Sequence, residues 1–369
     1  MEEVVSFNQN PTFMCEENNS RQAAVQDQHK VNVRVTLQGG MARVVVIGAG
    51  VIGLSTAINI QECMPGSHVT IVADSFNQYT LSDGAGAYIV PWAPGVDDVT
   101  QRKWGRASMD YFIKLAVSED SADNGASLAM GIFYNREQEP PPYHYLMLSC
   151  EPMSEESAKR LNLGKFHCYT ATTVAMEMRK YLPWLMRRFK DQGGTVKQRK
   201  VKSFQEFVGE YDVVVNCAGL GAKALTGDEK LQPMRGQMMR VSAPWVKHFM
   251  HGLSQLYFIP NSENVAVGGI KSIGDADTSI RPESSEYIWD NITKIWPPLK
   301  KAKLLWEWTG LRPYRVPPRV EAEVIRFRDK SLKVVHNYGH GSYGVSMSWG
   351  TAVHAAELVK DMVKPTSRL

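Results

Sequence analysis

The sequence predicts an α/β fold in two parts: a parallel sheet assembled from separate stretches of chain, and an inserted α+β part built on a largely antiparallel sheet. Three observations predict it. Residues 43–57 have the pattern of a buried strand, a glycine turn and a helix. A second apolar strand that runs into glycines, 211–219, comes much later in the chain. Between 232 and 269, short apolar runs alternate with turn residues, as in an antiparallel sheet.

The first strand and its turn have the spacing of a dinucleotide-binding unit. Val44–Ile47 are four β-branched residues, and Gly48, Gly50 and Gly53 follow in the G-x-G-x-x-G pattern. Gly48 allows a tight turn, Gly50 lets a pyrophosphate approach the backbone, and Gly53 lets the helix lie close to the strand. The phosphates would then face the unpaired N–H groups and the positive dipole end of the helix.

An acidic residue stands at the spacing that this unit requires. The second apolar run, His68–Ala73, ends in Asp74, at about 20 residues from the glycine turn, where a carboxylate accepts from the ribose hydroxyls. For the glycines alone, an ordinary structural turn is the alternative. With strand, turn, helix, strand and acid all present, we interpret the stretch as a dinucleotide site.

In the rest of the chain, apolar periodicity and the positions of Gly and Pro predict the helices and strands. The small residues 83–87 would either let backbone approach a flat ligand or form a flexible connection. Helices and strands are expected where apolar spacing is bounded by Gly or Pro: helices at 104–115, 173–192, 283–295 and 345–363, and strands at 195–199, 320–327 and 332–336.

Composition excludes several classes of protein. The chain has 369 residues and a net charge of +4, without a basic run that alternates with aromatic residues, so nucleic acid is not an expected partner. The longest apolar run, Val44–Ile58, is interrupted by glycines and too short to span a membrane. The five cysteines are scattered, which predicts no disulfide framework, no metal site and no paired dithiol. Residues 1–40 are polar, and we expect a disordered extension.

The last strand and its glycine turn carry a family resemblance. Val334–Gly344 (VVHNYGHGSYG), followed by Gly350–Ala352, resembles the signature of the D-amino acid oxidase and D-aspartate oxidase family, and the resemblance extends from Met41 to the C-terminus. It implies a split Rossmann-like FAD-binding domain with an inserted α+β substrate domain. The implied divisions are residues 41–98, 168–226 and 330–363 for FAD, residues 99–167 and 227–329 for substrate, and a tail at 364–369.

By resemblance, the cofactor is FAD. The residues expected to bind it belong to the two glycine turns and their flanks: Gly48, Gly50, Val51, Ile52, Gly53, Asp74, Ser82, Asp83, Val201, Gly339, Gly341, Ser342, Tyr343, Gly344 and Ser346. Elementary chemistry agrees for the second turn, because backbone N–H groups at a helix start can face the negative charge of a reduced flavin.

Two residues are implied to bind the substrate α-carboxylate. Arg312, in Gly-Leu-Arg-Pro, has the donor fork that matches a carboxylate, and Tyr257 would add its hydroxyl. A surface arginine and a half-buried tyrosine are the alternatives. The implied reaction transfers hydride from the α-carbon of a D-amino acid to flavin N5. The imino acid then hydrolyses to a 2-oxo acid and ammonia, and dioxygen is reduced to hydrogen peroxide. It needs no protein base, so His336 and His340 are interpreted as structural.

The substrate side chain is less well defined. By alignment with the family, His251 and Lys271 stand where the acidic branch has two arginines near the substrate side chain, and Ser342 resembles the acidic branch. Tyr343 resembles the neutral branch, and Leu253, in a shortened loop, stands where the neutral branch has a tyrosine. Lys271, and His251 if protonated, would favour a side-chain carboxylate, so we expect D-aspartate or D-glutamate. Neutral D-amino acids such as D-alanine and D-proline are the alternative.

Other identities and partners stay open at this point. An inactive FAD-binding protein and a NAD-dependent dehydrogenase are the alternatives to an oxidase. Ser367-Arg368-Leu369 resembles a peroxisomal address read by an import receptor, which predicts the peroxisomal matrix, with the cytosol as the alternative. A homodimer is an open expectation.

Overall fold

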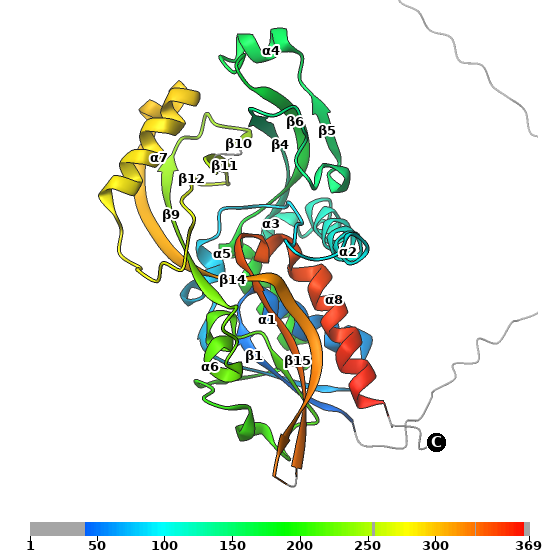
Figure 1. Ribbon diagram of the computed structural model, residues 1–369. Helices are drawn as coiled ribbons and strands as arrows, with labels where there is room; N and C mark the ends of the chain where they lie inside the picture. Colours follow the sequence, from blue (N-terminus) through cyan, green and yellow to red (C-terminus); the bar gives the residue numbers. More distant parts are fainter. Residues whose placement is uncertain (1–40, 253–254, 329, 365–369) are drawn as a thin grey trace, which may run out of the picture. The chain divides into compact units, whose positions relative to one another are not determined.

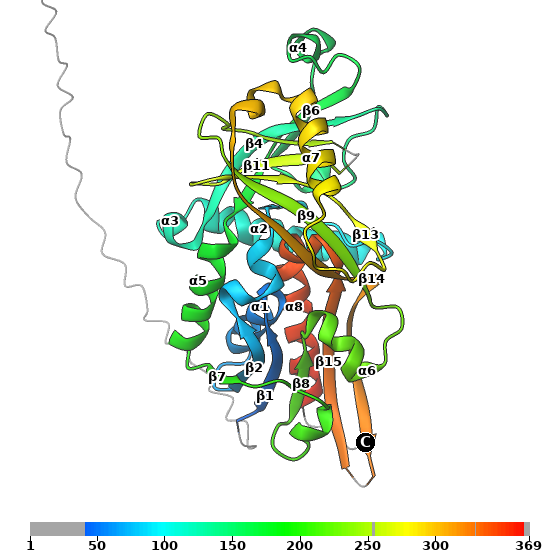
Figure 2. The same ribbon diagram turned by 90° about the vertical axis from the view of Figure 1, so that its left-hand side faces the viewer.

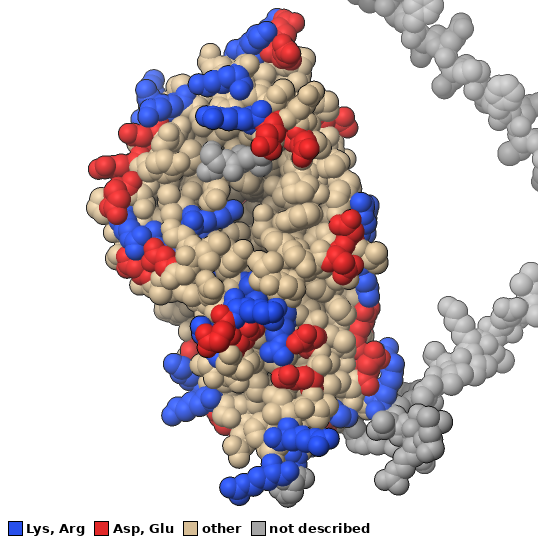
Figure 3. Space-filling model, in the orientation of Figure 1, with Lys and Arg blue, Asp and Glu red and all other residues tan. Residues whose placement is uncertain are grey.

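The computed structural model describes residues 41–252, 255–328 and 330–364. The predicted extension 1–40, the loop position Leu253 and the tripeptide Ser367–Leu369 lie outside these ranges. Within them, no helix has the length and apolar character needed to cross a membrane. Across the same ranges, no group of three or more His, Cys, Asp or Glu side chains is placed to hold a metal ion. On the face in Figure 3, Lys and Arg side chains are interspersed with Asp and Glu.

One continuous 15-stranded sheet organises the fold. In sheet order its strands are β3 (Ala87–Tyr88), β6 (His167–Met176), β4 (Ala126–Asn135), β10 (Phe249–Gly252), β11 (Tyr257–Pro260), β12 (Val265–Gly268), β9 (Gln232–Ser242), β14 (Lys303–Phe327), β15 (Lys330–His340), β8 (Val213–Asn216), β1 (Arg43–Ala49), β2 (His68–Phe76) and β7 (Thr195–Gln198). Off this path, β13 (Ser272–Ile273) pairs with β9 and β5 (Ser149–Pro152) pairs with β6.

The helices are α1 (Val51–Cys63), α2 (Asp98–Ala116), α3 (Ser121–Asn124), α4 (Glu155–Arg160), α5 (Met178–Asp191), α6 (Ala222–Thr226), α7 (Pro282–Ile295) and α8 (Gly344–Val363). In Figures 1 and 2, α1 and α8 lie side by side along the strands of the parallel half.

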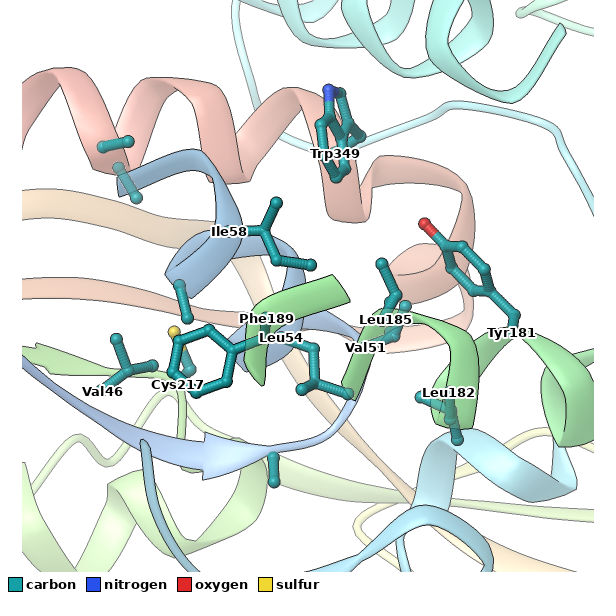
Figure 4. Packing of buried hydrophobic residues seen from close by; sticks show 14 of the residues in the cluster. Val46, Val51, Leu54, Ile58, Tyr181, Leu182, Leu185, Phe189, Cys217 and Trp349 are labelled. Carbon is teal, nitrogen blue, oxygen red and sulfur yellow. The ribbon is translucent and has the colours of Figure 1, made fainter. Parts of the chain in front are cut away.

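The parallel half is the predicted nucleotide-binding unit. Strands β15, β8, β1, β2 and β7 all run parallel. Both faces of β1 are buried: Val46 belongs to the cluster under α1, α5 and α8, and Val45 to the cluster on the opposite face with Phe207. Figure 4 shows Val46, Leu54 and Phe189 within the first cluster. This two-sided burial explains the uninterrupted apolar run of β1.

The antiparallel half confirms the expectation for residues 232–269. Strands β9, β12, β11 and β10 pair antiparallel in succession, and β4 then pairs parallel to β10. The strand expected at 320–327 is the end of β14, whose 25 residues pair first with β9 and then with β15. The register shifts between Tyr314 and Arg319, a stretch that contains Pro317 and Pro318. These prolines hid the continuity of the strand, because a proline usually marks a strand end.

Two predicted helices have different bounds. The helix expected at 173–192 begins at Met178, because the β-branched residues before it, including Thr172 and Thr173, pair with β4 as part of β6. The helix expected at 104–115 begins at Asp98. Its N-cap is Asp97, whose Oδ1 accepts from Thr100 N at 3.0 Å.

Helix α2 packs with the nucleotide-binding half. Its residues Met109 and Phe112 belong to the same buried cluster as Val46. The rings of Tyr111 and Trp349 of α8 stack at a centroid distance of 3.5 Å. The sequence prediction grouped residues 99–167 with the substrate domain; the apolar face of α2 instead places this helix against α8.

Candidate active site

The first glycine turn is sterically specified. Gly48 has φ of 105°, and a Cβ there would overlap the carbonyl oxygen of Cys217. A Cβ on Gly53 would overlap the Gly48 carbonyl, so the close contact of helix and strand requires glycine at both positions. The structure therefore confirms the steric reasons that the sequence predicted for Gly48 and Gly53.

Helix α1 begins with its N-terminus open. Its N-cap, Gly50, has no side chain, and no acidic residue stands in the first turn. Val51 N donates to Ser82 Oγ at 3.1 Å, and this serine belongs to the 3-10 turn Leu81–Gly84. The positive end of the helix dipole is thus left without a carboxylate of its own first turn, which suits a phosphate group.

A cavity of about 190 Å³ connects this helix start to the antiparallel half. The predicted site residues that line it come from both halves of the molecule: Val51, Ile52, Ser82, His251, Tyr257, Lys271, Arg312, Gly341, Ser342, Tyr343, Gly344 and Ser346. A neighbouring hollow of about 250 Å³ is also lined by Lys271 and by 339–343, so Gly339 lies there. No Asp or Glu of the described chain lines either space.

The second glycine turn brings another helix N-terminus to the same cavity. Gly339 has φ of 94° and Gly341 has φ of 56°, and a Cβ on Gly339 would lie 2.8 Å from Arg315 Cβ. Helix α8 then starts at Gly344 without a capping side chain or an acidic first turn. Ser346 Oγ, in that first turn, accepts from Val90 N at 3.0 Å. Two open helix N-termini therefore face one cavity.

The small residues after Ser82 fit a flat ligand. Gly84, Ala85, Gly86 and Ala87 all line the cavity. A Cβ on Gly84 would overlap the Trp308 indole, and one on Gly86 would lie 2.8 Å from Ala266 Cβ. This wall, together with the two helix starts, fits FAD: Gly48, Gly50 and Val51 would hold its pyrophosphate, and the small residues would face its ring system.

Seven of the expected cofactor residues are not among the lining residues of this cavity: Gly48, Gly50 and Gly53 of the first glycine turn, Gly339 of the second, and Asp74, Asp83 and Val201. Asp74 is exposed on β2, and Val201 packs against the buried cluster on the other face of the parallel half. Asp83 is buried, and its Oδ2 accepts from Arg179 Nε at 3.3 Å. Their expected contacts with FAD stay predictions.

Arg312 lines the cavity from the antiparallel half. It lies on β14 opposite Met234 of β9, and Gly236 makes room for it, because a Cβ on Gly236 would overlap the guanidinium. Its Nη1 donates to Ile270 O at 3.5 Å, and no described carboxylate pairs with it. Burial lowers the pKa of this guanidinium, with a partial offset from Tyr257, but arginine stays charged. A half-buried cation without a carboxylate partner, lining a cavity, suits the binding of an anion.

Tyr257 faces the same cavity from β11. It pairs with His251 of β10 on one side and with Gly268 of β12 on the other. A Cβ on Gly268 would lie 2.5 Å from Tyr257 Cζ, so the glycine creates the space for the ring. The structure therefore brings Tyr257 and Arg312 together, as the sequence predicted.

Lys271 is a second cation in the lining of the cavity. Burial, and then the charge of Arg312, lower the pKa of Lys271 to about 8. Burial, and then the charge of Lys271, lower the pKa of His251 to about 3. His251 would favour a side-chain carboxylate only if it were protonated, and both its burial and the nearby Lys271 ammonium disfavour that state. Ser342 also lines both hollows, and its Oγ lies 3.6 Å from Met234 Sδ.

The two other histidines are bonded inside the protein. His336 is bonded at both ring nitrogens, to Glu323 Oε1 at 2.9 Å and to Asn216 Nδ2 at 3.2 Å. His340 Nε2 lies 3.2 Å from Thr351 Oγ1, and burial lowers the pKa of His340 to about 4. Both arrangements suit neutral imidazoles.

One functional candidate has no signal in the sequence. Tyr88 lines the cavity, and its hydroxyl is hydrogen-bonded to His251 Nδ1. It directly follows the run of small residues 83–87 but lies 163 positions from its partner. Only the sheet brings the two together.

Comparison with known proteins agrees with this geometry. Residues 43–358 match the family model described as FAD dependent oxidoreductase. The chain is 38% identical over 327 residues to D-aspartate oxidase of Homo sapiens, covering 87% of this chain and 96% of that protein. It is 34% identical over 334 residues to D-aspartate oxidase 1 of Caenorhabditis elegans, covering 86% and 97%. D-amino acid oxidase of Dugesia ryukyuensis is 29% identical over 327 residues, with 87% and 98% covered.

Solved structures have the same fold. Glycine oxidase from Geobacillus kaustophilus superposes with a TM-score of 0.69 at 15% identity, covering 89% of this chain and 96% of that one. Glycine oxidase from Bacillus cereus has a TM-score of 0.68 at 18% identity, with 87% and 95% covered. The family match over most of the chain, the two open helix starts and the cavity between them lead to one conclusion: the chain belongs to the D-amino acid oxidase (DAO) family of FAD-dependent oxidoreductases, and its cofactor is FAD.

Proposed function

We propose that this protein oxidises D-amino acids to imino acids, which hydrolyse to 2-oxo acids and ammonia, and reduces dioxygen to hydrogen peroxide, with D-aspartate and D-glutamate as preferred substrates. The observation that carries the proposal is the half-buried Arg312 guanidinium, which lines the same cavity as Tyr257 and has no carboxylate partner in the described chain. The names of the relatives, D-aspartate oxidase and D-amino acid oxidase, support the same reaction.

Arg312 and Tyr257 would bind the α-carboxylate. A guanidinium presents two parallel N–H donors to the two carboxylate oxygens, and the Tyr257 hydroxyl would add a third donor. Because Arg312 is desolvated, its unpaired charge is unfavourable until an anion arrives. Binding therefore fixes the orientation of the α-carbon, which is the main contribution of the protein to a hydride transfer.

The cavity has no strong base in its described lining except Lys271, which is mostly protonated at neutral pH. It has no Asp or Glu in its lining, and the pKa values of His251 and His340 are lowered to about 3 and about 4. FAD, when bound, supplies the acceptor for the hydride that leaves the α-carbon. The residues around it then have to position the substrate and exclude water, and the substrate amine has to arrive neutral.

Lys271 supports the acidic preference. With a pKa of about 8, it is mostly charged at neutral pH, and no described Asp or Glu pairs with it. It lines both the cavity and the neighbouring hollow. A side-chain carboxylate of the substrate would complete an ion pair there, whereas D-alanine would leave the ammonium without a partner.

The test is a hydrogen peroxide assay with the FAD-loaded enzyme. D-aspartate, D-glutamate, D-alanine and D-proline are each compared by kcat/KM, with the L-enantiomers as controls. We expect the two acidic D-amino acids to lead. A clear preference for D-alanine or D-proline would contradict the acidic preference, and the absence of peroxide with every D-amino acid, from a yellow protein, would contradict the oxidase itself.

Two expected partners stay predictions. An import receptor for Ser367–Leu369 and a homodimer are supported by the sequence pattern and by the family resemblance alone. Localisation of the full chain with a free C-terminus, and its mass in solution, are the measurements that decide them.

A further inference from the structure

A row of paired residues crosses the antiparallel half and forms one wall of the cavity. The pairs are Phe133 with His251, His251 with Tyr257, Tyr257 with Gly268, Gly268 with Met238, and Met238 with Trp308. Residues directly opposite each other in neighbouring strands share a face of the sheet. His251 therefore faces the same way as Tyr257, and both line the cavity.

Tyr88, on β3, packs against this row of residues. Its ring stacks on Phe249, two positions before His251 on β10, with a centroid distance of 5.0 Å and an interplanar angle of 5°. It meets the ring of Phe133 edge-on at 6.1 Å. Packed in this way, the Tyr88 hydroxyl reaches His251 Nδ1. The bond is therefore held by rigid neighbours on two strands.

The direction of this hydrogen bond can be derived. Burial raises the pKa of Tyr88 well above its ordinary value, so the phenol keeps its proton. His251 is neutral, with one ring nitrogen protonated. The Tyr88 proton has no other acceptor in the described part of the chain. The phenol must then donate to Nδ1, and the proton of the imidazole lies on Nε2.

The Nε2–H group of His251 is left for a ligand. It makes no hydrogen bond to any described residue. It is also not enclosed by protein atoms, so it is accessible from the cavity. His251 is half-buried and lines the same cavity as Lys271. The cavity thus offers a neutral donor and an ammonium, with no described carboxylate in its lining to take either of them.

We propose that Tyr88 is a positioning residue for the substrate side chain: it holds His251 in the Nε2–H tautomer, so that a side-chain carboxylate is recognised by one neutral donor and one cation, Lys271. The inference rests on the proposed acidic preference. It assigns a role to a tyrosine that does not itself need to touch the substrate, and it makes Lys271 the only charge that selects for the side chain among the described residues of the cavity wall.

Tyr88→Phe tests this directly, because it removes the hydroxyl and keeps the ring that stacks on Phe249. Without its donor at Nδ1, His251 also populates the Nδ1–H tautomer, which presents a lone pair to the substrate carboxylate. We expect kcat/KM for D-aspartate to fall by about 3- to 10-fold, through KM, as for loss of one neutral hydrogen bond. Turnover of D-alanine should change little.

The matched control is Tyr169→Phe. Tyr169 belongs to the same buried cluster as Tyr88 but does not line the cavity, and its hydroxyl donates to Gln138 O at 2.6 Å. Its loss should leave the D-aspartate to D-alanine ratio unchanged. In a second background, His251→Gln, an amide donor replaces the imidazole and cannot change tautomer. Adding Tyr88→Phe there should no longer alter the ratio.

A spectroscopic measurement separates positioning from simple loss of stability. In the FAD-loaded enzyme with ¹⁵N-labelled histidine, the His251 signals are identified by their absence in His251→Gln. We expect the Nε2–H tautomer in the wild type and a mixture in Tyr88→Phe. A charged or Nδ1–H His251 in the wild type, or an unchanged ratio in Tyr88→Phe, would overturn the inference. A wild type that prefers D-alanine would instead overturn the proposed function.

Discussion

At the scale of single residues, the main feature of the site is that its two positive charges have no carboxylate partner in the described chain. Arg312 and Lys271 are both desolvated, and neither has a carboxylate partner in the described chain. His251 lines the same cavity, and its lowered pKa favours the neutral form. Two cations and one neutral donor match the proposed substrate with two carboxylates, one at the α-carbon and one on the side chain.

The side-chain preference should depend on pH through Lys271. Its pKa of about 8 lies below the ordinary lysine value of 10.5, so the ammonium is present at pH 7 and is lost as the pH rises through 8. We expect KM for D-aspartate, relative to that for D-alanine, to rise by about 10-fold between pH 7 and pH 9.5, as for loss of a charged hydrogen bond.

The control for this profile is Lys271→Met, which keeps much of the side-chain length without the charge. This variant should show the high relative KM at every pH. A ratio that stays flat with pH in the wild type would show that Lys271 does not select the side chain. His251 should not contribute to the profile, because its pKa of about 3 lies far below the range.

The sequence identified the residues of the site better than their states. Arg312 and Tyr257 were found because they stand in motifs that resemble a family. The sequence left the protonation of His251 open, because the pKa depends on burial and on Lys271, which no local pattern reports. Tyr88 was missed because its role depends on a contact with β10, far away in the chain.

At the scale of elements, the pair β9 and β14 places Arg312 in the lining of the cavity. Arg312 pairs with Met234 and extends over Gly236, two residues further along β9, because Gly236 has no side chain. On β14 itself, a Cβ on Gly310 would overlap the Trp308 ring. The glycines in these strands therefore act as space for large side chains that line the cavity, although glycine weakens a strand.

Gly236→Ala should separate folding from substrate binding. The added Cβ would collide with the end of the Arg312 side chain, which can move, whereas the strand pairing is unaffected. We expect normal FAD content and a loss of about 100-fold in kcat/KM for every D-amino acid, as for a displaced substrate clamp. Peroxide production measures the loss, and flavin absorbance measures FAD.

The control is Gly221→Ala, at an exposed position where the new Cβ would lie 3.6 Å from Ala218 Cβ, an ordinary contact. It should have wild-type kinetics. If Gly236→Ala also had wild-type kinetics, the position of Arg312 against the cavity would not matter for binding.

Helices and strands could be predicted from the sequence where the same pattern of burial continues along the whole element. Strand β1 is buried on both faces, and its apolar run was unambiguous. Strand β14 has a largely half-buried surface and contains Pro313, Pro317 and Pro318, so its length of 25 residues could not be inferred from local propensity. The start of α5 was misplaced because the end of β6 is apolar too, and the two runs merge.

At the scale of the whole molecule, a single sheet joins two tasks. Its parallel half ends in two helix N-termini that suit a dinucleotide, and its antiparallel half carries Arg312 and Tyr257. Strand β14 belongs to both halves, because it pairs with β9 at one end and with β15 at the other. We therefore expect different residues around one cavity to bind the cofactor and the substrate, so that a substitution can abolish substrate binding and leave FAD binding intact.

The most direct measurement is peroxide production by FAD-loaded Arg312→Ala, with Arg312→Lys as the variant that keeps a charge without the donor fork. We predict that both variants stay yellow. We also predict that Arg312→Ala loses activity on D-aspartate by about 100-fold or more, with Arg312→Lys in between. An Arg312→Ala protein that oxidises D-aspartate like the wild type, or one that no longer binds FAD, would contradict this account.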